Sequence, residues 1–446
     1  MKGTDQVSGL VIRQIKVDLS TCPPRGGRTL NIEENEQLEV RCTLVRWVPP
    51  TKRHLKDELT STISHFISSI SHQWRCLMIM SRRRSLAIIG GGVVLAAAVP
   101  VGGFLASRTP TKALEPWDRA GKYDDARLRA LSYALLAPNP HNRQPWEVDL
   151  IGDDRLALYR DKKRNLPVTD PFARQLTVGM GCFIELMEMA AANERIGVET
   201  RLFPDGDDGP VAVCTFEAGA GKPNPLFQQT MARRSHKEMF DKRSVDAATS
   251  SPLRAHADVF LDGAERDELR RIAHDAWMTE VQTPAAWKES VDLLRLGKAE
   301  INANPDGIDV GGPMIDTLVV LGLATREAAL DINNPNARAP IEGTANAIRS
   351  APAMTVIRTS ENSRSEQIEA GRRWLRLNLE ATGAGLALRP VSQALQEYAE
   401  MQLHYKSIHA QFARSGETIQ MLGLLGYGAR TSRTPRWPIE SRMRNV

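Results

Sequence analysis

The sequence predicts an α+β protein in which two similar halves, each a sheet packed with helices, follow one another in one chain. A long apolar helical pattern occurs twice, at 176–196 and at 366–382, and glycine follows each one. An extended apolar segment comes next in both places, which indicates an internal duplication. The stretches 113–230 and 231–446 are each long enough for a domain, and the second carries an insertion at about 241–345.

The first half is expected to alternate between helices and short strands. Its predicted elements are a helix at 125–136 that stops at Pro138-Asn139-Pro140, a hairpin of 146–150 and 156–159, the helix 176–196 ending at Gly197, and strands at 198–203 and 211–216.

The second half repeats this series after the insertion. Its predicted elements are a strand at 353–358, the helix 366–382, an extended segment at 386–391, an apolar helix at 409–425 and a turn at Gly426-Tyr427-Gly428. The insertion is expected to hold helices at 264–276 and 287–303, and Gly/Pro/Asn-rich loops at 304–313 and 333–343. Such loops either cover a site or are decoration.

Composition excludes several classes of protein. The 446 residues are 42% hydrophobic and 25% charged, which is typical of a globular protein, and the net charge of +5 is small. Aromatic residues do not alternate with basic clusters, so nucleic acid is not an expected partner. None of the five cysteines has metal-ligand spacing, and no metal is predicted. Buried free thiols are favoured for Cys182 and Cys214, with a disulfide between them as the alternative.

Residues 80–112 predict an export signal and a spacer. Ser81-Arg82-Arg83-Arg84 precede the Gly/Ala-rich run 87–105, which has no charge, and this order is found in secretory signals. The paired arginines resemble the twin-arginine signal, with Ser85 where that signal prefers phenylalanine. A membrane anchor formed by 86–105 is the alternative. We therefore expect export by the twin-arginine machinery, to the periplasm or to a membrane-anchored position.

The chain upstream of this signal, 1–79, is predicted to be disordered or to precede the true start. It has no sustained periodicity, and an export signal works only near an N-terminus. Met78 or Met80 is therefore the predicted first residue. The triplet Gly90-Gly91-Gly92 does not predict a dinucleotide loop, because neither an acidic residue nor a βαβ unit follows it.

Two short polar segments carry the candidate chemistry. The first is A-P-N-P-H-N-R-Q-P-W at 137–146, and the second is R-R-S-H-K-E-M-F at 233–240. Two arginines, a serine and a lysine within five residues can surround a phosphate, because guanidinium groups bind its oxygens in pairs. The alternative for the second segment is a solvated run of charges at a helix start.

These segments resemble the nitroreductase motifs A-P-S-x-x-N-x-Q-P-W and R-R-S-x-R/K. The segment 374–396 is similar to the late helix and strand of that family, and 426–428 with Pro435-Arg436 resembles its closing segment. In ordinary members the R-R-S motif comes first, and two identical chains form two FMN sites. Here it opens the second half, so the resemblance implies a fused pseudo-dimer with one composite FMN site, as in a tandem-half subgroup that includes a mycobacterial dormancy-associated form.

The resemblance also implies which residues bind FMN. Arg233, Arg234, Ser235, Lys237 and Arg436, with Arg433 as a weaker candidate, are expected at the phosphate and ribityl chain, and Pro138, Asn139, Pro140, Asn142 and Ser392 around the flavin ring. Gln144 and Trp146 are expected to hold the loop in the core. His141 and His236 are not needed for flavin chemistry, because the cofactor itself stores the electrons, so no catalytic residue is predicted.

Two functions follow from this resemblance. The first is an FMN-dependent oxidoreductase that passes electrons from NAD(P)H, through the flavin, to a nitro or quinone-like acceptor. The second is an FMN-binding storage or stress protein whose flavin is covered by a lid formed from the insertion. In both cases we expect a monomer, because the fused halves already contain the interface that ordinary members form between chains.

Overall fold

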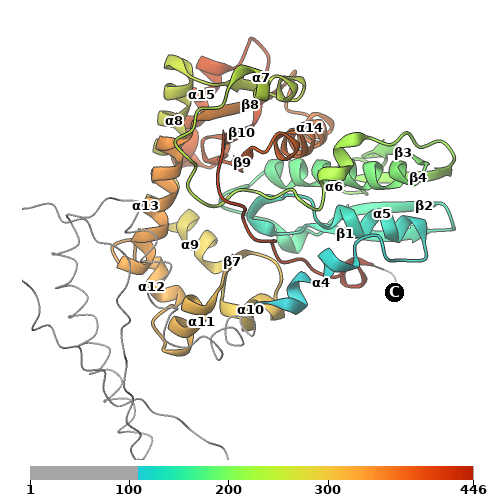
Figure 1. Cartoon of the computed structure of the whole chain (residues 1–446), viewed down its shortest axis with the longest axis horizontal. Coiled ribbons are helices and arrows are strands. Elements are labelled where there is room, and N and C mark those ends of the chain that lie inside the picture. The colour runs from blue at the N-terminus through green and yellow to red at the C-terminus, as the bar shows by residue number, and fades with distance from the viewer. Residues whose placement is uncertain (1–108, 445–446) are drawn as a thin grey trace, which may run out of the picture. The chain divides into compact units, whose positions relative to one another are not determined.

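A four-stranded antiparallel sheet and three helices form the first half (Figure 1). The computed structural model describes residues 109–444. The strands lie in the order β1 (Trp146–Ile151), β2 (Arg155–Arg160), β4 (Ala212–Ala218) and β3 (Ile196–Leu202). The helices are α4 (Thr111–Arg119), α5 (Ala126–Ala134) and α6 (Arg174–Asn193).

The second half repeats this topology. Its strands lie in the order β5 (Asp258–Phe260), β8 (Ala353–Thr359), β10 (Thr418–Gly426) and β9 (Ala387–Pro390). Its helices outside the insertion are α7 (Ala247–Ser250), α14 (Arg364–Gly383) and α15 (Gln402–Phe412). In both sheets the order is first, second, fourth and third strand, and a 20-residue helix joins the second strand to the third. The predicted α+β fold with two similar halves, each a sheet packed with helices, is confirmed.

The two 20-residue helices cross at a pair of glycines. Gly181 and Gly371 are each the eighth residue of their helix, counted from Arg174 and Arg364. A Cβ added at Gly371 would lie 2.0 Å from the Val178 carbonyl oxygen, and one added at Gly181 would lie 2.1 Å from a carbonyl oxygen of α14. Because equivalent positions meet, the halves are related by an approximate twofold axis through this crossing. Only glycine permits so close an approach of the two backbones.

The C-terminal segment returns from the second half to the first. Met443 forms a parallel bridge with Val148 of β1, and the Arg444 amide donates to the Val148 carbonyl at 2.9 Å. The indole of Trp117 in α4 donates to the Thr434 carbonyl at 2.8 Å. The largest core cluster joins residues of α5, α6 and α14, so one hydrophobic core stabilises both halves.

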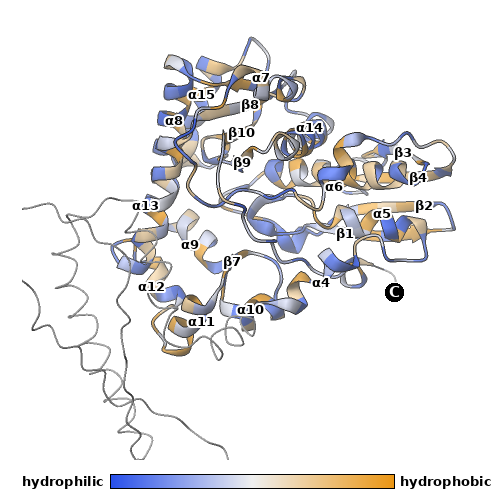
Figure 2. Ribbon diagram, in the orientation of Figure 1, coloured by the Kyte–Doolittle hydropathy of each residue, from blue (hydrophilic) through white to orange (hydrophobic). Residues whose placement is uncertain are grey.

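An insertion, residues 261–352, separates β5 from β8. The equivalent strands β1 and β2 are joined only by a short turn at Gly152. The insertion contains α8 (Gly263–Gln282), α9 (Pro284–Asp292), β6 (Leu294–Leu296), α10 (Gly297–Ala303), β7 (Ile308–Val310), α11 (Pro313–Val320), α12 (Arg326–Leu330) and α13 (Pro335–Ser350). Figure 2 shows the apolar residues of α11, of which Met314 and Val320 are exposed. The insertion was expected to begin at about 241, but it begins after β5, because β5 belongs to the second sheet.

The prediction of one apolar helix at 409–425 is wrong. Helix α15 ends at Phe412, and the rest of the apolar run forms strand β10. A short continuous apolar run fits a buried strand as well as a buried helix, so its periodicity does not distinguish them. Residues 419–426 are all buried, because β10 is an inner strand of its sheet.

Three smaller predictions also differ from the structure. The helix expected at 287–303 is broken, because Gly297 has a φ of +76° and starts a new helix after the short strand β6. The loop expected at 333–343 lies in α13, where Pro335 occupies the first turn, a position that tolerates proline. Helix α6 ends before Gly197, which lies in β3.

Cys182 and Cys214 are buried free thiols, as predicted. Within residues 109–444, no helix is long and apolar enough to cross a membrane. The predicted export signal, the alternative anchor at 86–105 and the predicted start at Met78 or Met80 lie outside the described residues.

Candidate functional site

The loop that follows α5 has an unusual backbone. His141, Asn142 and Gln144 have φ values of +46°, +52° and +51°, a region that residues other than glycine rarely adopt. Such conformations cost about 1–3 kcal/mol each and persist only where neighbouring groups hold them. Asn139 Oδ1 accepts from the Gln144 amide at 2.7 Å, and Gln144 Oε1 accepts from the Trp437 amide at 2.9 Å. The C-terminal segment therefore holds this loop in its strained shape.

The loop packs against helix α6. A Cβ added at Gly179 would lie 3.1 Å from both Asn139 Cβ and Pro140 Cδ, so the missing side chain lets the loop approach the helix closely. The Asp170 carboxylate accepts from the Gln175 and Leu176 amides at 3.0 and 2.9 Å and so satisfies the N-terminus of the helix. The first turns of α6 thus have a fixed position beneath the loop.

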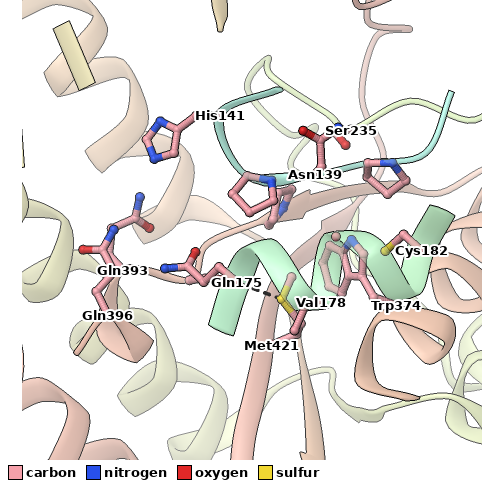
Figure 3. A pocket seen from close by; sticks show the side chains of 15 residues that line it. Asn139, His141, Gln175, Val178, Cys182, Ser235, Trp374, Gln393, Gln396 and Met421 are labelled. Atoms are coloured by element: carbon pink, nitrogen blue, oxygen red, sulfur yellow. Dashed lines mark hydrogen bonds between the residues drawn. The ribbon is translucent and has the colours of Figure 1, made fainter. Parts of the chain in front are cut away.

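A pocket of about 220 Å³ lies where the loop and α6 meet the second half (Figure 3). The first half contributes the loop and the start of α6, and the second half contributes α14, β10 and the segments at 235 and 390–396. The lining residues are Pro138, Asn139, Pro140, His141, Gln175, Val178, Gly179 and Cys182 from the first half, and Ser235, Trp374, Pro390, Ser392, Gln393, Gln396 and Met421 from the second. This pocket is therefore formed by residues of both halves.

Beside this pocket lies a cluster of arginines. Arg233 is 2% exposed, and its Nη2 donates to the Leu136 carbonyl at 2.8 Å. Its Nε and Nη1 are buried and have no hydrogen-bond partner within residues 109–444. Arg234 stacks over Trp117, with its guanidinium carbon 4.6 Å from the ring centroid. No described carboxylate forms an ion pair with Arg233 or Arg234, so this part of the site carries excess positive charge.

The pKa values of these side chains reflect the excess charge. Burial and then the neighbouring Arg234 lower the pKa of Arg233 to about 10. Burial, followed by Arg430 and Arg433, lowers the pKa of Arg234 to about 10. Burial and Arg233 lower the pKa of Arg436 to about 9. Mutual repulsion between buried cations is relieved by a bound anion, and a phosphate has the charge and the acceptor atoms to do so.

The structure brings the predicted site residues together in two groups. Pro138, Asn139, Pro140, Ser235 and Ser392 line the pocket, and Arg233 and Arg234 lie beside it. Three predicted residues are occupied elsewhere. Asn142 Nδ2 donates to the Pro435 carbonyl at 3.1 Å. Arg436 donates to Asn142 Oδ1 at 2.7 Å and to three carbonyls at the end of α5. Lys237 forms a 2.6 Å ion pair with Asp309.

Arg436 and Asn142 therefore support the loop rather than line the pocket. The three carbonyls at 135–137 that Arg436 binds follow the last turn of α5, where a cation also interacts favourably with the helix dipole. Arg436 then reaches Asn142 and fixes the loop relative to the C-terminal segment. Arg433 pairs with Asp118 on the surface at 2.7 Å.

Sequence reasoning missed the helical and late residues of the pocket. Gln175, Val178 and Cys182 are spaced three to four residues apart, so one face of α6 carries all of them. That spacing is also the signature of an ordinary buried helix face. Gln393 and Gln396 lay inside the segment recognised as family-like, but nothing in the sequence distinguishes a pocket amide from a surface amide.

His141 and His236, the two histidines in the candidate segments, are uncharged near neutral pH. Burial lowers the pKa of His141, which lines the pocket, to about 4. Burial also lowers the pKa of His236, whose ring packs against Phe240 with centroids 4.7 Å apart. His141 therefore faces the pocket as a neutral imidazole, and His236 belongs to the core.

The insertion holds the outer side of the loop. Asp306 is 8% exposed and accepts from three arginines: Arg164 at 2.6 Å, Arg295 at 2.9 Å and Arg143 at 3.4 Å. The side-chain Nε2 of Gln144 donates to the Pro305 carbonyl of the insertion at 2.6 Å. None of the residues that line the pocket belongs to the insertion. The insertion thus contacts the loop beside the pocket, and the pocket itself is lined by residues outside the insertion.

The symmetry-related position on the other side of the helix crossing is filled by ion pairs. Cys182 and Arg372 are equivalent, because each is the ninth residue of its helix. Arg372 pairs with Glu185 at 3.0 Å and also with Glu188, and Arg376 pairs with Glu185 at 2.6 Å. A partly buried network of ion pairs therefore occupies the position that is equivalent to the pocket.

Comparisons with known proteins find partial similarities. No protein-family model matches the chain. The chain is 32% identical over 84 residues to a curated protein found in two strains of Mycobacterium tuberculosis, whose name assigns it to the NAD(P)H nitroreductases (acg). The match covers 19% of this chain and about a quarter of the length of that relative. Together with the ordered motifs, it supports a nitroreductase-like family for the chain.

Several solved structures are also similar to parts of the chain. The nitroreductase NfnB of Mycobacterium smegmatis, solved with NADPH, is 15% identical and has a TM-score of 0.32, over 50% of this chain and 98% of that one. A nitroreductase-like protein of Bacillus cereus is 14% identical and has a TM-score of 0.28, and the match covers 50% of this chain and 96% of that one. A nitroreductase of Bacteroides fragilis with bound FMN is 12% identical and has a TM-score of 0.26, and the match covers 47% of this chain and 91% of that one. All three TM-scores lie below 0.5.

Proposed function

We propose that this chain is an exported, FMN-dependent oxidoreductase that passes electrons from NAD(P)H to a nitro or quinone-like acceptor. The observation that carries this proposal is Arg233, whose buried Nε and Nη1 lack a partner within residues 109–444 and lie next to a pocket formed by both halves. A phosphomonoester supplies the acceptors that these donors need. The partial similarity to the curated NAD(P)H nitroreductase supports the choice of donor.

The residues present fit FMN in charge. Arg233 and Arg234 would hold the phosphate, and the Ser235 hydroxyl stands where the arginine cluster adjoins the pocket. Pro138 to Pro140 on one side and Ser392 on the other would enclose the ring between rigid segments. FMN, when bound, supplies the chemistry, because its ring accepts a hydride and releases electrons to an acceptor. The protein binds, orients and shields the ring, and no side chain has to take a covalent part.

A second function, storage of FMN without turnover, is favoured by the position of the insertion. The ion pair of Lys237 with Asp309 and the bond from Gln144 Nε2 to the Pro305 carbonyl hold the insertion against the edge of the site, as in a covered site. The enzyme remains the first proposal, since no residue of the insertion lines the pocket. A single open cleft would serve donor and acceptor in turn and predicts ping-pong kinetics.

One experiment tests both functions. The full chain is purified, saturated with FMN and dialysed, and the visible absorbance is recorded before and after NADPH is added without oxygen. A yellow protein that bleaches supports the oxidoreductase, and a yellow protein that keeps its colour supports storage. A colourless protein after dialysis contradicts both.

Export and a monomeric state are part of the proposal and have separate tests. The twin-arginine segment at 81–84 and the uncharged run 87–105 support export through a route that carries folded, cofactor-loaded proteins. The single core shared by both halves supports a monomer. Mass spectrometry of the native N-terminus and fractionation of the periplasm test the first point. Analytical ultracentrifugation of the FMN-loaded protein tests the second.

A further inference from the structure

Helix α11 and the turn that follows it expose an apolar surface that the proposed chemistry does not use (Figure 2). Eight large apolar side chains are exposed within residues 109–444, and four of them lie between 314 and 323. These four, called the apolar patch below, are 45–75% exposed and are Met314, Val320, Leu321 and Leu323. Exposed apolar side chains that gather in this way mark contact with another protein or with a membrane.

The apolar patch is continuous and carries no charge. Met314 and Leu321 are seven positions apart, so they lie on the same side of α11. The Leu323 amide donates to a carbonyl of α11 at 2.8 Å, which folds the turn back against the end of the helix. Asp316 is the only charged residue between 310 and 324, and it is 5% exposed. No charge therefore has to lose its water when this surface is covered.

The N-terminal end of the described chain meets the insertion close to the apolar patch. The Ala113 amide of α4 donates to Asn302 Oδ1, near the end of α10, at 3.0 Å. The Lys298 amide, near the start of α10, donates to Asp316 of α11 at 2.7 Å. Because α10 has seven residues and is about 10 Å long, α4, α10 and α11 follow one another closely (Figure 1). The chain that precedes α4 thus joins the fold beside the apolar patch.

This preceding chain contains the uncharged run 87–105. All its residues are apolar, glycine or proline. A segment that covered the apolar patch in water would need a polar outer side, whereas a run that is apolar on all sides fits a lipid bilayer. Residues 106–110 join this run to α4, and five extended residues reach at most about 20 Å. An anchor formed by 86–105 would therefore hold α11 close to the membrane surface.

We infer that the apolar patch docks on the lipid bilayer in which residues 86–105 are anchored. Helix α11 has eight residues, too few to span a bilayer, so it lies in the interfacial region with its exposed apolar side chains among the acyl chains. Anchor and patch together fix the orientation of the fold on the membrane. The inference goes beyond the proposed oxidoreductase, because it requires neither bound FMN nor turnover.

The test uses the full chain in vesicles of phosphatidylcholine and phosphatidylglycerol, with a small share of a phospholipid that carries a photoactivatable diazirine on its acyl chain. After illumination, mass spectrometry identifies the labelled peptides. Labels are expected at 313–323 as well as at 86–105. Leu403 of α15 is 75% exposed, the same fraction as Val320, but it lies outside the apolar patch. Its peptide is the internal control and should stay unlabelled.

Two variants show whether the apolar patch itself makes the contact. The double change Val320→Glu and Leu323→Glu should lower the labelling at 313–319 roughly tenfold or more, because two apolar side chains are replaced by charges that the acyl chains exclude. Leu403→Glu is the matched control and should leave the labelling unchanged. All three positions are exposed, so the thermal unfolding of both variants should match that of the wild type. Labelling at 86–105 should persist in both, since the anchor is intact.

Several results would overturn the inference. The first is a wild type without labels at 313–323, or a patch variant that is labelled as strongly as the wild type. Cross-links from 313–323 to 86–105 in place of lipid would assign the patch to the chain's own segment. A dimer that the patch variant dissociates in sedimentation would assign it to a second copy. A mature N-terminus beyond residue 105 would remove the anchor. A protein that binds no FMN or keeps its colour with NADPH contradicts the proposed oxidoreductase alone.

Discussion

Replacement of Arg233 by methionine should stabilise the flavin-free protein and weaken its affinity for FMN. The fall of the Arg233 pKa from its ordinary value to about 10 corresponds to about 3 kcal/mol of unfavourable free energy for the buried cation. Methionine removes this cost but also loses the hydrogen bond to the Leu136 carbonyl, worth about 1 kcal/mol. The flavin-free variant should therefore be more stable than the wild type by about 2 kcal/mol.

The same change should cost affinity, because it removes donors to the phosphate. Loss of a charge-assisted contact amounts to about 1.5–3 kcal/mol, or roughly tenfold or more in Kd. Urea unfolding of flavin-free and FMN-saturated protein measures the stability, and quenching of flavin fluorescence measures the Kd. At one FMN concentration, a tenfold weaker Kd reduces the stabilisation by FMN by about 1.4 kcal/mol.

A matched control is Arg127→Met, at another buried arginine. Arg127 is 6% exposed and donates to the Gly152 and Arg155 carbonyls and to Asp125, which raises its pKa. Because its partners are complete, its loss should destabilise the protein by about 1–3 kcal/mol and leave the FMN affinity unchanged. If Arg233→Met behaved like this control, the arginine cluster would not be an anion site and the reasoning would be refuted.

Three further predictions follow from other parts of the structure. Asn142→Ala should lower the FMN content after dialysis, measured by visible absorbance, because it frees the strained loop from the C-terminal segment; an unchanged content would contradict the two-half site. Glu280 has a raised pKa, so its contribution to stability is present below about pH 4.5 and is lost as the pH rises towards 7. Glu280→Gln should remove about 3 kcal/mol of that pH dependence in urea unfolding at pH 5 and pH 8, and identical curves would refute the assignment. Gly371→Ala should destabilise the protein by about 1–3 kcal/mol in thermal unfolding because its Cβ meets a carbonyl of α6, whereas Gly383→Ala, with 3.6 Å of clearance, should be neutral.

Much of the element pattern could be read from the sequence, but only where the periodicity had a single interpretation. The hairpin predicted at 146–150 and 156–159 and the helix predicted at 366–382 occur nearly as expected, because alternation and helical spacing are local signals. The prediction for the run that forms β10 is wrong, because continuous apolar character does not distinguish a buried strand from a buried helix.

The candidate site shows the same division. The R-R-S segment could be recognised as a candidate because it resembles a nitroreductase motif, since residue type and spacing alone also fit a solvated run of charges. Which of its members remain available could not be recognised, since Lys237 is paired with Asp309 in the insertion, 72 positions away. Arg436 resembled a phosphate contact, yet its guanidinium donates to carbonyls at the end of α5, to Asn142 in the loop and to the Pro435 carbonyl.

The sequence by itself determined the local elements, the duplication and the chemistry of two polar segments, because these depend on short-range spacing and side-chain type. Only the tertiary structure decided that Gly181 meets Gly371, that the pocket lies on one side of this crossing and that ion pairs fill the other. It also decided that Glu280 stands behind Gln396. Those facts depend on contacts between residues 116 to 190 positions apart, which form only when both halves bury one core.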